Sequence, residues 1–218
     1  MEFQPLFPEL TGPHLAIGWA SIDALQGTVH PTEWQDVATA AAPRQREFIA
    51  GRLLATALAK SLSLAAKPVR RADDRSPIWP ADRQGSLSHC KELCAGVIGT
   101  TDAIQSAGID IEVLGRVQPK LWPTLFTERE CDYLNTVDPA VVAIEATTFF
   151  SAKEAFYKCQ FPLTGDWVGF QDVELQRTSD STLRVTPTRS APRPWHGSPI
   201  HTVRLENSHV ATLMVLPA

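Results

Sequence analysis

The sequence predicts an α+β protein made of two similar α/β halves, residues 1–103 and residues 104–218. Two observations lead to this fold class. Segments with the β-branched and aromatic composition of strands alternate along the chain with segments of helical spacing. The order of these segments also repeats after about 100 residues, a period too long for a solenoid. The repeat predicts pseudo-twofold symmetry, with the active site in the cleft between the halves.

The first half is expected to hold one long helix and several strands. Residues 14–22 are rich in β-branched and aromatic side chains, which favours a strand. Residues 86–90 and 93–100 have the pattern of two short strands on either side of a Lys-Glu turn. The helix predicted over 44–64 has apolar residues at helical spacing, namely Phe48, Ile49, Leu53, Leu54, Ala57 and Leu58.

The second half repeats this order. One helix is predicted from Thr127 and another through residues 149–159. The proline-rich stretch from Pro187 to Pro199 is predicted to be a loop. The predicted strands of this half cover residues 106–113, 170–176, 201–207 and 210–216.

The composition excludes several classes of protein. Apolar residues make up 44% of the chain and charged residues 20%, which is typical of a folded domain. The net charge of −4 lacks the basic excess of a nucleic-acid-binding protein. No apolar run is long enough to span a membrane, and the first residues do not have the pattern of a signal peptide. We therefore expect a folded cytoplasmic protein with no membrane span and no nucleic-acid partner.

The four cysteines favour the same compartment. Four cysteines in 218 residues do not make a disulfide-dense scaffold. Cys90 and Cys94, beside His89, suggest a zinc site, but no second pair of ligands lies nearby to complete four. We expect Cys90, Cys94, Cys131 and Cys159 to be buried, reduced thiols.

Two acidic residues share one face of a predicted strand. Asp110 and Glu112 are two residues apart, so their side chains leave the same side. Their Cα atoms would lie roughly 7 Å apart, and at an effective dielectric of about 20 the two carboxylates would repel by roughly 2 kcal/mol. A hard divalent cation is the simplest group that offsets this repulsion. The alternative is an edge strand whose polar face is simply hydrated.

A helical motif further along the chain adds a third carboxylate. Glu154 and Lys158 are four residues apart on one face of the helix, and Lys153 adds a second cation. The pattern fits either a reactive site or a surface helix in which Ser151 and Glu154 form a capping box. The capping interpretation fails if the helix already begins near Thr147.

A second candidate capping box lies at Thr127 and Glu130. In this case we expect Glu130 to cap its own helix and to have no catalytic role.

Arginines and a Ser-His pair can hold a phosphorylated ligand through charge-assisted hydrogen bonds. The sequence has neither a P-loop nor a dinucleotide-binding fingerprint, so side chains must hold any nucleotide. Ser88 and His89 are neighbours on a strand and point in opposite directions, which disfavours serine-hydrolase chemistry. The candidate arginines are Arg44, Arg46, Arg52, Arg70, Arg71 and Arg75.

Three motifs give the sequence a resemblance to a known family. They are SLSHC at 86–90, GIDIE at 108–112 and FSAKEAFYK at 150–158. In this order they resemble the 4′-phosphopantetheinyl transferases, particularly the two-half group that activates surfactin and enterobactin synthetases. Residues 46–55, 75–80 and 125–134 also look like the enterobactin synthetase component D branch.

The resemblance implies a Mg²⁺-dependent phosphotransferase. Such an enzyme transfers the 4′-phosphopantetheine arm of coenzyme A to a serine of an apo acyl, aryl or peptidyl carrier protein and releases 3′,5′-ADP, often for siderophore or secondary-metabolite biosynthesis. By similarity, Asp110, Glu112 and Glu154 would bind the metal. Glu154 also matches the general base, and Lys158 matches the lysine that neutralises or protonates the leaving phosphate.

The resemblance also implies the contacts to coenzyme A. The first half would bind the 3′-phosphate end, and the second half would carry the metal-binding carboxylates and the catalytic helix. The choices between Arg44 and Arg46, and between Arg71 and Arg75, stay open. A complete active site within one chain predicts a monomer. The predicted contacts are Arg46, Arg52, Arg75, Ser88, His89, Lys153 and Lys158.

Two other functions stay open from the sequence. A non-catalytic module that binds coenzyme A or a carrier protein would keep the arginines and His89, but it needs no trio of carboxylates. A divalent-metal phosphatase or nuclease would use a positioned water in place of a carrier serine. The net charge of −4 disfavours a nucleic-acid substrate.

Overall fold

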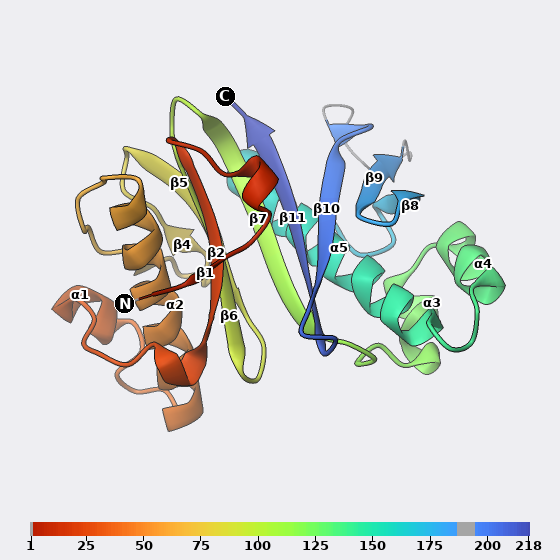
Figure 1. Ribbon diagram of the computed structural model, residues 1–218, viewed down its shortest axis with the longest axis horizontal. Helices are drawn as coiled ribbons and strands as arrows, with labels where there is room; N and C mark the ends of the chain where they lie inside the picture. The colour runs from red at the N-terminus through yellow and green to blue at the C-terminus, as the bar shows by residue number, and fades with distance from the viewer. Residues whose placement is uncertain (1, 187–194) are drawn as a thin grey trace. The chain divides into compact units, whose positions relative to one another are not determined.

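The computed structural model describes residues 2–186 and 195–218. The chain divides into two compact units, Met1–Ala107 with Leu216–Ala218, and Gly108–Val215 (Figure 1). The predicted boundary after residue 103 precedes strand β7 (Ile104–Val113), and the boundary between the units falls inside this strand. Each unit combines a β-sheet with one long helix, so the α+β fold class is confirmed.

The first unit is built on a four-stranded antiparallel sheet with the strand order β1-β2-β6-β5. Helix α2 (Ala42–Ser61) packs across this sheet (Figure 1). Gly96 of β6 lets the helix come close, because a Cβ there would lie 3.0 Å from Leu58 and 2.9 Å from Leu87. The strands are β1 (Gln4–Pro5), β2 (Leu15–Ser21), β5 (Arg83–His89) and β6 (Leu93–Thr100).

Short elements complete the first unit. Asp36 joins two of them, since its carboxylate accepts hydrogen bonds from the Arg70 guanidinium at 3.0 and 2.9 Å and from the Arg71 N–H at 2.9 Å. These elements are η1 (Pro8–Leu10), η2 (Ile22–Ala24), α1 (Pro31–Gln35), β3 (Arg70–Arg71) and β4 (Pro77–Ile78).

The second unit is built on a five-stranded sheet with the strand order β7-β11-β10-β9-β8, so β7 lies at an edge. Its long helix is α5 (Val142–Thr164), which ends at Gly165 in the left-handed region at φ 69°. The other strands are β8 (Glu174–Ser179), β9 (Thr182–Thr186), β10 (Pro199–Leu205) and β11 (His209–Pro217). The shorter helices are η3 (Pro119–Leu121), α3 (Trp122–Leu125) and α4 (Glu128–Thr136).

Strand β7 and helix α5 meet at a glycine. A Cβ on Gly108 would lie 1.8 Å from the carbonyl oxygen of Ala155 and 2.6 Å from the backbone nitrogen of Cys159. Only glycine lets the two backbones approach this closely. The contact places the residues that follow Gly108 on the strand within reach of charged side chains on the helix.

The predicted helices and strands are present, and several of them start or end at other residues than predicted. The strand predicted from residue 170 begins at Glu174, because residues 169–172 form a turn. In that turn the Asp172 N–H donates to the Gly169 carbonyl and the Gly169 N–H donates to the Asp172 carboxylate, both at 3.0 Å. Strands β1 and β9, the β3-β4 ribbon and the short helices other than α4 were not predicted.

The predicted proline-rich loop falls largely on residues 187–194, which lie outside the described residues, and β10 begins at Pro199. Among the described helices, none is both long and apolar enough to cross a membrane.

Candidate active site

Strand β7 carries two buried carboxylates. Asp110 and Glu112 are both buried although the strand lies at a sheet edge. Burial raises the pKa of Glu112, and the negative charge of Asp110 raises it further, while Arg116 and Lys158 lower it. The two carboxylates therefore repel each other as predicted. The alternative of a hydrated polar face is wrong, because α5 packs against this strand.

Helix α5 brings Glu154 and Lys158 to these carboxylates. The Lys158 ammonium donates to Asp110 Oδ1 at 2.7 Å and to the Ile109 carbonyl at 3.2 Å. Burial raises the pKa of Glu154, Lys158 lowers it, and the charge of Asp110 raises it. We call Asp110, Glu112 and Glu154 the acidic cluster.

The helix that carries Glu154 starts earlier than a capping role would require. Helix α5 begins at Val142, so Ser151 lies inside it, and the capping-box interpretation of Ser151 and Glu154 is wrong. Ser151 is buried and shares a hydrogen bond of 2.9 Å with Thr212 of β11. Glu154 and Lys158, which follow Ser151 by about one and two turns, therefore have no role in capping the start of the helix.

Lys153 does not join its neighbours Glu154 and Lys158. It is 1% exposed, and its ammonium lies 2.6 Å from the Glu130 carboxylate and donates to the carbonyl oxygens of Leu125 and Phe170. These three partners use all three hydrogens of the ammonium. This placement argues against the predicted phosphate contact of Lys153.

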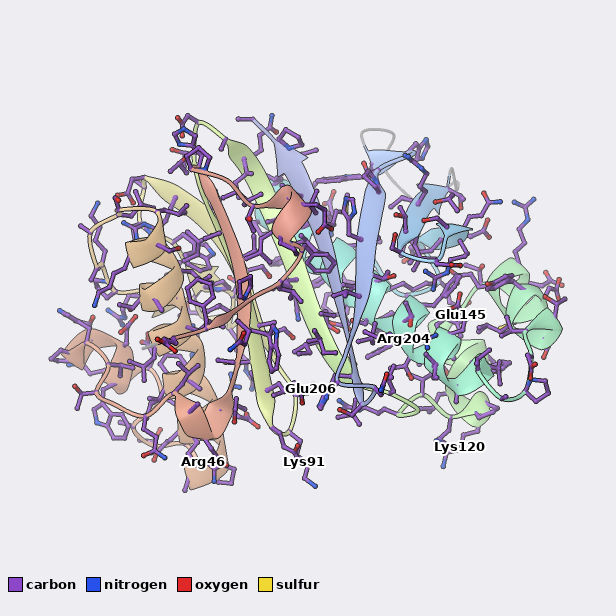
Figure 2. All side chains as sticks on the ribbon, viewed as in Figure 1. Arg46, Lys91, Lys120, Glu145, Arg204 and Glu206 are labelled. Atoms are coloured by element: carbon purple, nitrogen blue, oxygen red, sulfur yellow. The ribbon has the colours of Figure 1, made fainter. Side chains whose placement is uncertain are left out.

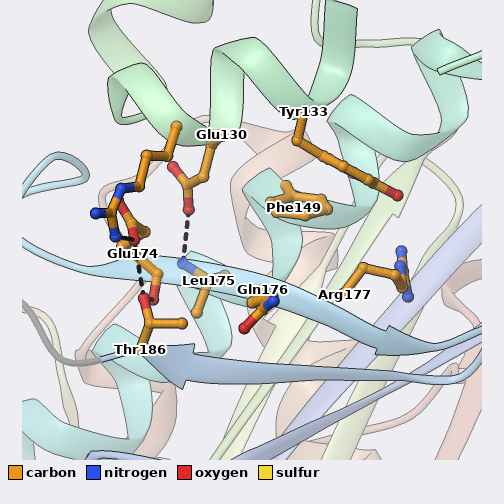
Figure 3. A pocket seen from close by; sticks show the side chains of 9 residues that line it. Glu130, Tyr133, Phe149, Glu174, Leu175, Gln176, Arg177 and Thr186 are labelled. Carbon is orange, nitrogen blue, oxygen red and sulfur yellow. Dashed lines mark hydrogen bonds and ion pairs between the residues drawn. The ribbon is translucent and has the colours of Figure 1, made fainter. Parts of the chain in front are cut away.

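Glu130 has the predicted capping role and a second one. It forms the predicted capping box with Thr127, whose N–H donates to Glu130 at 2.8 Å. Its other oxygen accepts a 2.8 Å hydrogen bond from the Leu175 N–H of β8 (Figure 3). Burial raises the pKa of Glu130 and lowers that of Lys153. Through its contacts with Thr127, Lys153 and Leu175, Glu130 connects α4 with α5 and β8.

An apolar pocket of about 170 Å³ opens beside Glu154. Trp167 is largely exposed on its rim, and its ring packs edge-on against Tyr157 with a centroid distance of 5.2 Å. Such a wall suits an uncharged, flexible group of a ligand. No pattern in the sequence indicates this pocket, which is lined by Lys153, Glu154, Phe156, Tyr157, Val173 and residues 167–170.

A larger cavity of about 420 Å³ is lined by residues of α4, α5, β8 and β9 (Figure 3). Its charged groups are paired within the protein. Arg177 binds both oxygens of Glu145 at 2.8 and 2.6 Å, and Glu174 lies 3.4 Å from Arg129. None of the predicted site residues lines this cavity, so the acidic cluster is the better candidate for a reactive site.

In the first unit, α2 and β5 bring Arg44 and His89 together. As predicted for neighbours on a strand, Ser88 is buried and His89 is exposed. The Arg44 guanidinium donates to His89 Nε2 at 2.5 Å. The Glu47 carboxylate lies 3.3 Å from Arg44 and 3.6 Å from His89 Nδ1. Arg44, which the sequence left as the alternative to Arg46, therefore contacts the predicted Ser-His pair.

Arg52 is a buried cation on the same helix. It is 8% exposed, its guanidinium lies 4.2 Å from the ring centre of Phe48, and its Nε has no hydrogen-bond partner among the described residues. Burial lowers the pKa of Arg52 to about 10, partly offset by Glu33 and Asp36. Arg52 borders a cavity of about 260 Å³. A buried guanidinium with an unfilled donor is well suited to receive an anionic ligand.

The other two predicted arginines lie elsewhere in the first unit. Arg46 lies near the N-terminal end of α2 and pairs with Asp23 at 3.0 Å, both exposed (Figure 2). Arg75 lies in a turn with a left-handed φ of 74°. The positive charge of Arg71, like that of Arg44, lowers the pKa of Arg52. Arg44 is thus the member of its pair that contacts His89, and Arg71 is the member of its pair whose charge acts on Arg52.

The acidic cluster offers the oxygen donors that Mg²⁺ prefers. Among the described residues, no three His, Cys, Asp or Glu side chains are arranged to hold a metal ion by themselves. Mg²⁺ is usually bound by one or two carboxylates together with waters and substrate phosphates. The donor set therefore fits an ion shared between protein carboxylates and a phosphorylated ligand, not an ion in an all-protein cage.

Arg116 is a further member of the site that the sequence analysis missed. Its Nη1 lies 2.7 Å from Oε2 of Glu112. The signal in the sequence is an arginine four residues after Glu112, beyond the end of the strand.

Two family models match the chain. The 4′-phosphopantetheinyl transferase N-terminal domain matches residues 32–99, and the 4′-phosphopantetheinyl transferase superfamily matches residues 106–214.

Two of the three curated relatives compared with the chain carry the same name. The chain is 34% identical to 4′-phosphopantetheinyl transferase PptT of Mycobacterium tuberculosis, over 70% of this chain and 66% of the relative. It is 30% identical to 4′-phosphopantetheinyl transferase Npt of Nocardia iowensis, over 67% of this chain and 65% of the relative. It is 31% identical to enterobactin synthase component D of Escherichia coli K12, over 61% of each. The chain thus spans slightly less than two thirds of the length of these relatives.

A solved structure of a holo-(acyl-carrier-protein) synthase from Bacillus anthracis, in complex with CoA (3′,5′-ADP), aligns with 53% of this chain and 98% of that chain. Its sequence identity of 21% and TM-score of 0.41 are too low to bear on the fold. The family match is decisive, because the second family model alone covers half of the chain and includes the whole acidic cluster. The chain belongs to the 4′-phosphopantetheinyl transferase superfamily.

Proposed function

We propose that this protein transfers the 4′-phosphopantetheine arm of coenzyme A to a serine of an apo carrier protein. The observation that carries the proposal is the convergence of Asp110, Glu154 and Lys158 in a member of this superfamily. In this reaction the serine oxygen bonds to the phosphorus that bears the pantetheine arm. The bond from that phosphorus to the bridging oxygen breaks, 3′,5′-ADP leaves, and the serine proton passes to a base.

The second unit would carry the chemistry. The raised pKa of Glu154 makes its carboxylate a better proton acceptor toward the serine hydroxyl. Lys158 supplies positive charge next to Asp110, where it can neutralise the departing phosphate. Asp110, Glu112 and Glu154 would hold Mg²⁺ together with the pyrophosphate. When bound, the ion would offset negative charge on the transferring phosphoryl group.

The apolar pocket beside Glu154 is proposed to receive the pantetheine arm. The arm is uncharged and flexible, and the pocket has aromatic walls that include Tyr157, Trp167 and Phe170. Contact with these rings would order the arm and exclude water close to the proposed base, which favours transfer over hydrolysis.

The first unit is proposed to bind the 3′-phosphate end of coenzyme A through Arg44, Arg52, Arg71 and His89, with Ser88 beside them. The strongest support is Arg52, because a phosphate oxygen would satisfy its buried donor. The contact between Arg44 and His89 adds a second cationic group near this helix.

The proposed partners are apo carrier proteins of the acyl, aryl or peptidyl type. We further propose that the protein acts as a monomer in the cytoplasm, supported by the presence of both family domains in one chain.

The test is intact-protein mass spectrometry of a panel of apo carriers mixed with this protein, coenzyme A and Mg²⁺, with and without EDTA. The expected result is a mass gain of one phosphopantetheine arm that is lost with EDTA. Asp110→Ala and Glu154→Gln should each slow transfer by about 10²–10⁴-fold while leaving the fold intact. Glu128→Gln, on the exposed side of α4, is the matched control and should transfer normally.

Other outcomes would point to other functions. If no carrier gains mass but coenzyme A raises the melting temperature, the protein is a binding module. If inorganic phosphate is released without carrier modification, it is a phosphatase. Full activity of Asp110→Ala would refute the metal assignment.

A further inference from the structure

Two of the protein's own cations already occupy the acidic cluster. Lys158 contacts Asp110, and Arg116 contacts Glu112. The side chain of Glu112 is 11% exposed, whereas that of Arg116 is 62% exposed. Arg116 therefore reaches from the solvent onto a carboxylate that is largely withdrawn from water.

The turn that carries Arg116 holds it in place. Gly115 has a left-handed φ of 77°, and its N–H donates to Thr147 Oγ1 at 3.1 Å. Thr147 is fully buried in α5. The Arg116 N–H donates to the Val113 carbonyl at 3.3 Å, which closes the turn. Because the backbone is anchored on α5, Arg116 reaches Glu112 with little loss of conformational entropy.

The two cations differ in how easily they can leave. The Lys158 ammonium is held by the Asp110 carboxylate and the Ile109 carbonyl on the inner side of α5. The Arg116 guanidinium lies at the surface, where water can replace Glu112 at small cost. Arg116 is therefore the cation that a metal ion would displace.

A metal ion at Glu112 would compete with this arginine. Arg116 contacts Glu112 Oε2, which is one of the two oxygens that Glu112 can offer. A divalent ion on either oxygen would also lie within a few ångströms of the guanidinium and repel it. Glu112 therefore cannot bind Arg116 and the metal ion at full strength at the same time.

We propose that Arg116 is an exchangeable counter-ion of Glu112 that competes with the divalent metal and so sets the metal concentration at which the site fills. This inference rests on the proposed function, because it requires a metal at the acidic cluster. Without metal, Arg116 is the counter-ion of Glu112, which it contacts at 2.7 Å. When the metal binds, the guanidinium moves into the solvent.

The test is direct titration of the full chain with Mn²⁺, followed by electron paramagnetic resonance of the free ion. Mn²⁺ takes the same oxygen ligands as Mg²⁺. The variants are Arg116→Gln, Arg116→Lys, Glu112→Gln and Arg129→Gln. Arg129→Gln is the matched control, because Arg129 is 82% exposed and lies 3.4 Å from Glu174, which is 13% exposed, in the same unit.

We expect Arg116→Gln to bind Mn²⁺ about two- to fivefold more tightly than the wild-type protein, as expected when an ion pair of this kind is removed. Arg116→Lys should lie between them, and Arg129→Gln should match the wild type. In EDTA, Arg116→Gln should melt about 2–4 °C below the wild type, because Glu112 loses its counter-ion. Adding Mn²⁺ should restore the melting temperature.

The inference is overturned if Arg116→Gln binds Mn²⁺ no more tightly than Arg129→Gln. If Glu112→Gln loses Mn²⁺ binding in that same experiment, the proposed metal site stands and only the role of Arg116 fails. If Glu112→Gln binds Mn²⁺ as tightly as the wild type, the metal assignment of the proposed function fails as well.

Discussion

Arg52 and Lys153 are both buried cations, but their surroundings differ. Lys153 is enclosed by the Glu130 carboxylate and two carbonyl oxygens. Arg52 packs on the Phe48 ring, and its Nε lacks a hydrogen-bond partner in the described part of the chain. A buried charge without a full set of partners lowers stability, whereas the attraction within a fully paired one offsets much of its desolvation cost until one partner is removed. The surroundings of Arg52 suit a ligand site, and those of Lys153 suit a structural role.

This difference predicts opposite effects for the same kind of substitution. Arg52→Met should melt at the wild-type temperature or above, because it removes a desolvated charge. It should also weaken coenzyme A binding by about tenfold or more, because a charge-assisted hydrogen bond is lost. Thermal unfolding and isothermal titration calorimetry with coenzyme A measure the two effects.

Lys153→Met is the matched comparison. It leaves Glu130 buried without its cation and should lower the free energy of unfolding by about 3–5 kcal/mol. If Arg52→Met were destabilised to the same degree with unchanged affinity for coenzyme A, Arg52 would be a structural residue and not a ligand contact.

In both units, the long helix approaches a strand closely at a glycine, which has no side chain to keep the two apart. Gly108 on β7 touches the backbone of α5, and Gly96 on β6 touches leucines of α2. The GIDIE motif therefore has two parts with different tasks. Its carboxylates belong to the acidic cluster, and its glycine lets the helix that carries Glu154 and Lys158 come close enough to reach them.

Gly108→Ala should destabilise the second unit. The added Cβ would overlap the Ala155 carbonyl at 1.8 Å, and both partners are backbone atoms of regular elements that cannot move independently. Overpacking of this kind costs about 3 kcal/mol or more. Chemical denaturation measures the loss.

The matched control is Gly51→Ala in the middle of α2. There the added Cβ would meet only a Leu87 methyl group at 3.9 Å, which is ordinary contact. This change should raise the free energy of unfolding by about 0.5–1 kcal/mol, because alanine favours the helix. Equal stability of the two variants would contradict the proposed close approach of β7 and α5.

Over the whole molecule, one part of the pH dependence of stability comes from ion-paired carboxylates of the first unit. The Arg70 guanidinium holds the pKa of Asp36 below its usual range, and Arg83 and Lys67 do the same for Asp82. A carboxyl whose pKa is lower in the folded than in the unfolded state stabilises the fold at every pH above its unfolded pKa. That contribution is lost as the pH falls through the folded value.

The contribution of Asp36 and Asp82 to the melting temperature should therefore be level near neutral pH and fall below about pH 4, near the unfolded pKa of aspartate. Asp36→Asn should melt about 3 °C below the wild type at pH 6. The difference should shrink toward pH 2, where the wild-type carboxyl is also neutral. Scanning calorimetry across this range provides the measurement, and a difference that grows in acid would show that Asp36 acts through something other than its charge.

Much of the architecture could be predicted from local pattern. The spacing of Leu54 and Leu58 indicates a helix, and the alternation around Asp110 indicates a strand, because each pattern depends only on nearby residues. The acidic cluster could be predicted only from the order of the three motifs that resemble the family, because each motif alone also fitted a hydrated strand face or a capping box. The turn at residues 169–172 was missed because it depends in part on a side-chain hydrogen bond, which the Asp172 carboxylate accepts from the Gly169 N–H.

The partners of the charged side chains could not be read from the sequence. Lys153 and Glu154 are adjacent in the chain, yet one binds Glu130 and the other belongs to the acidic cluster, because successive residues on a helix point in different directions. Arg44 contacts His89 across 45 positions, and Arg116 turns back onto Glu112 only because Gly115 is anchored to α5. Residue types and local spacing thus specify which chemistry the chain carries. The packing of distant elements specifies which cation meets which carboxylate, because a contact between them exists only after the strand and the helix have been brought together.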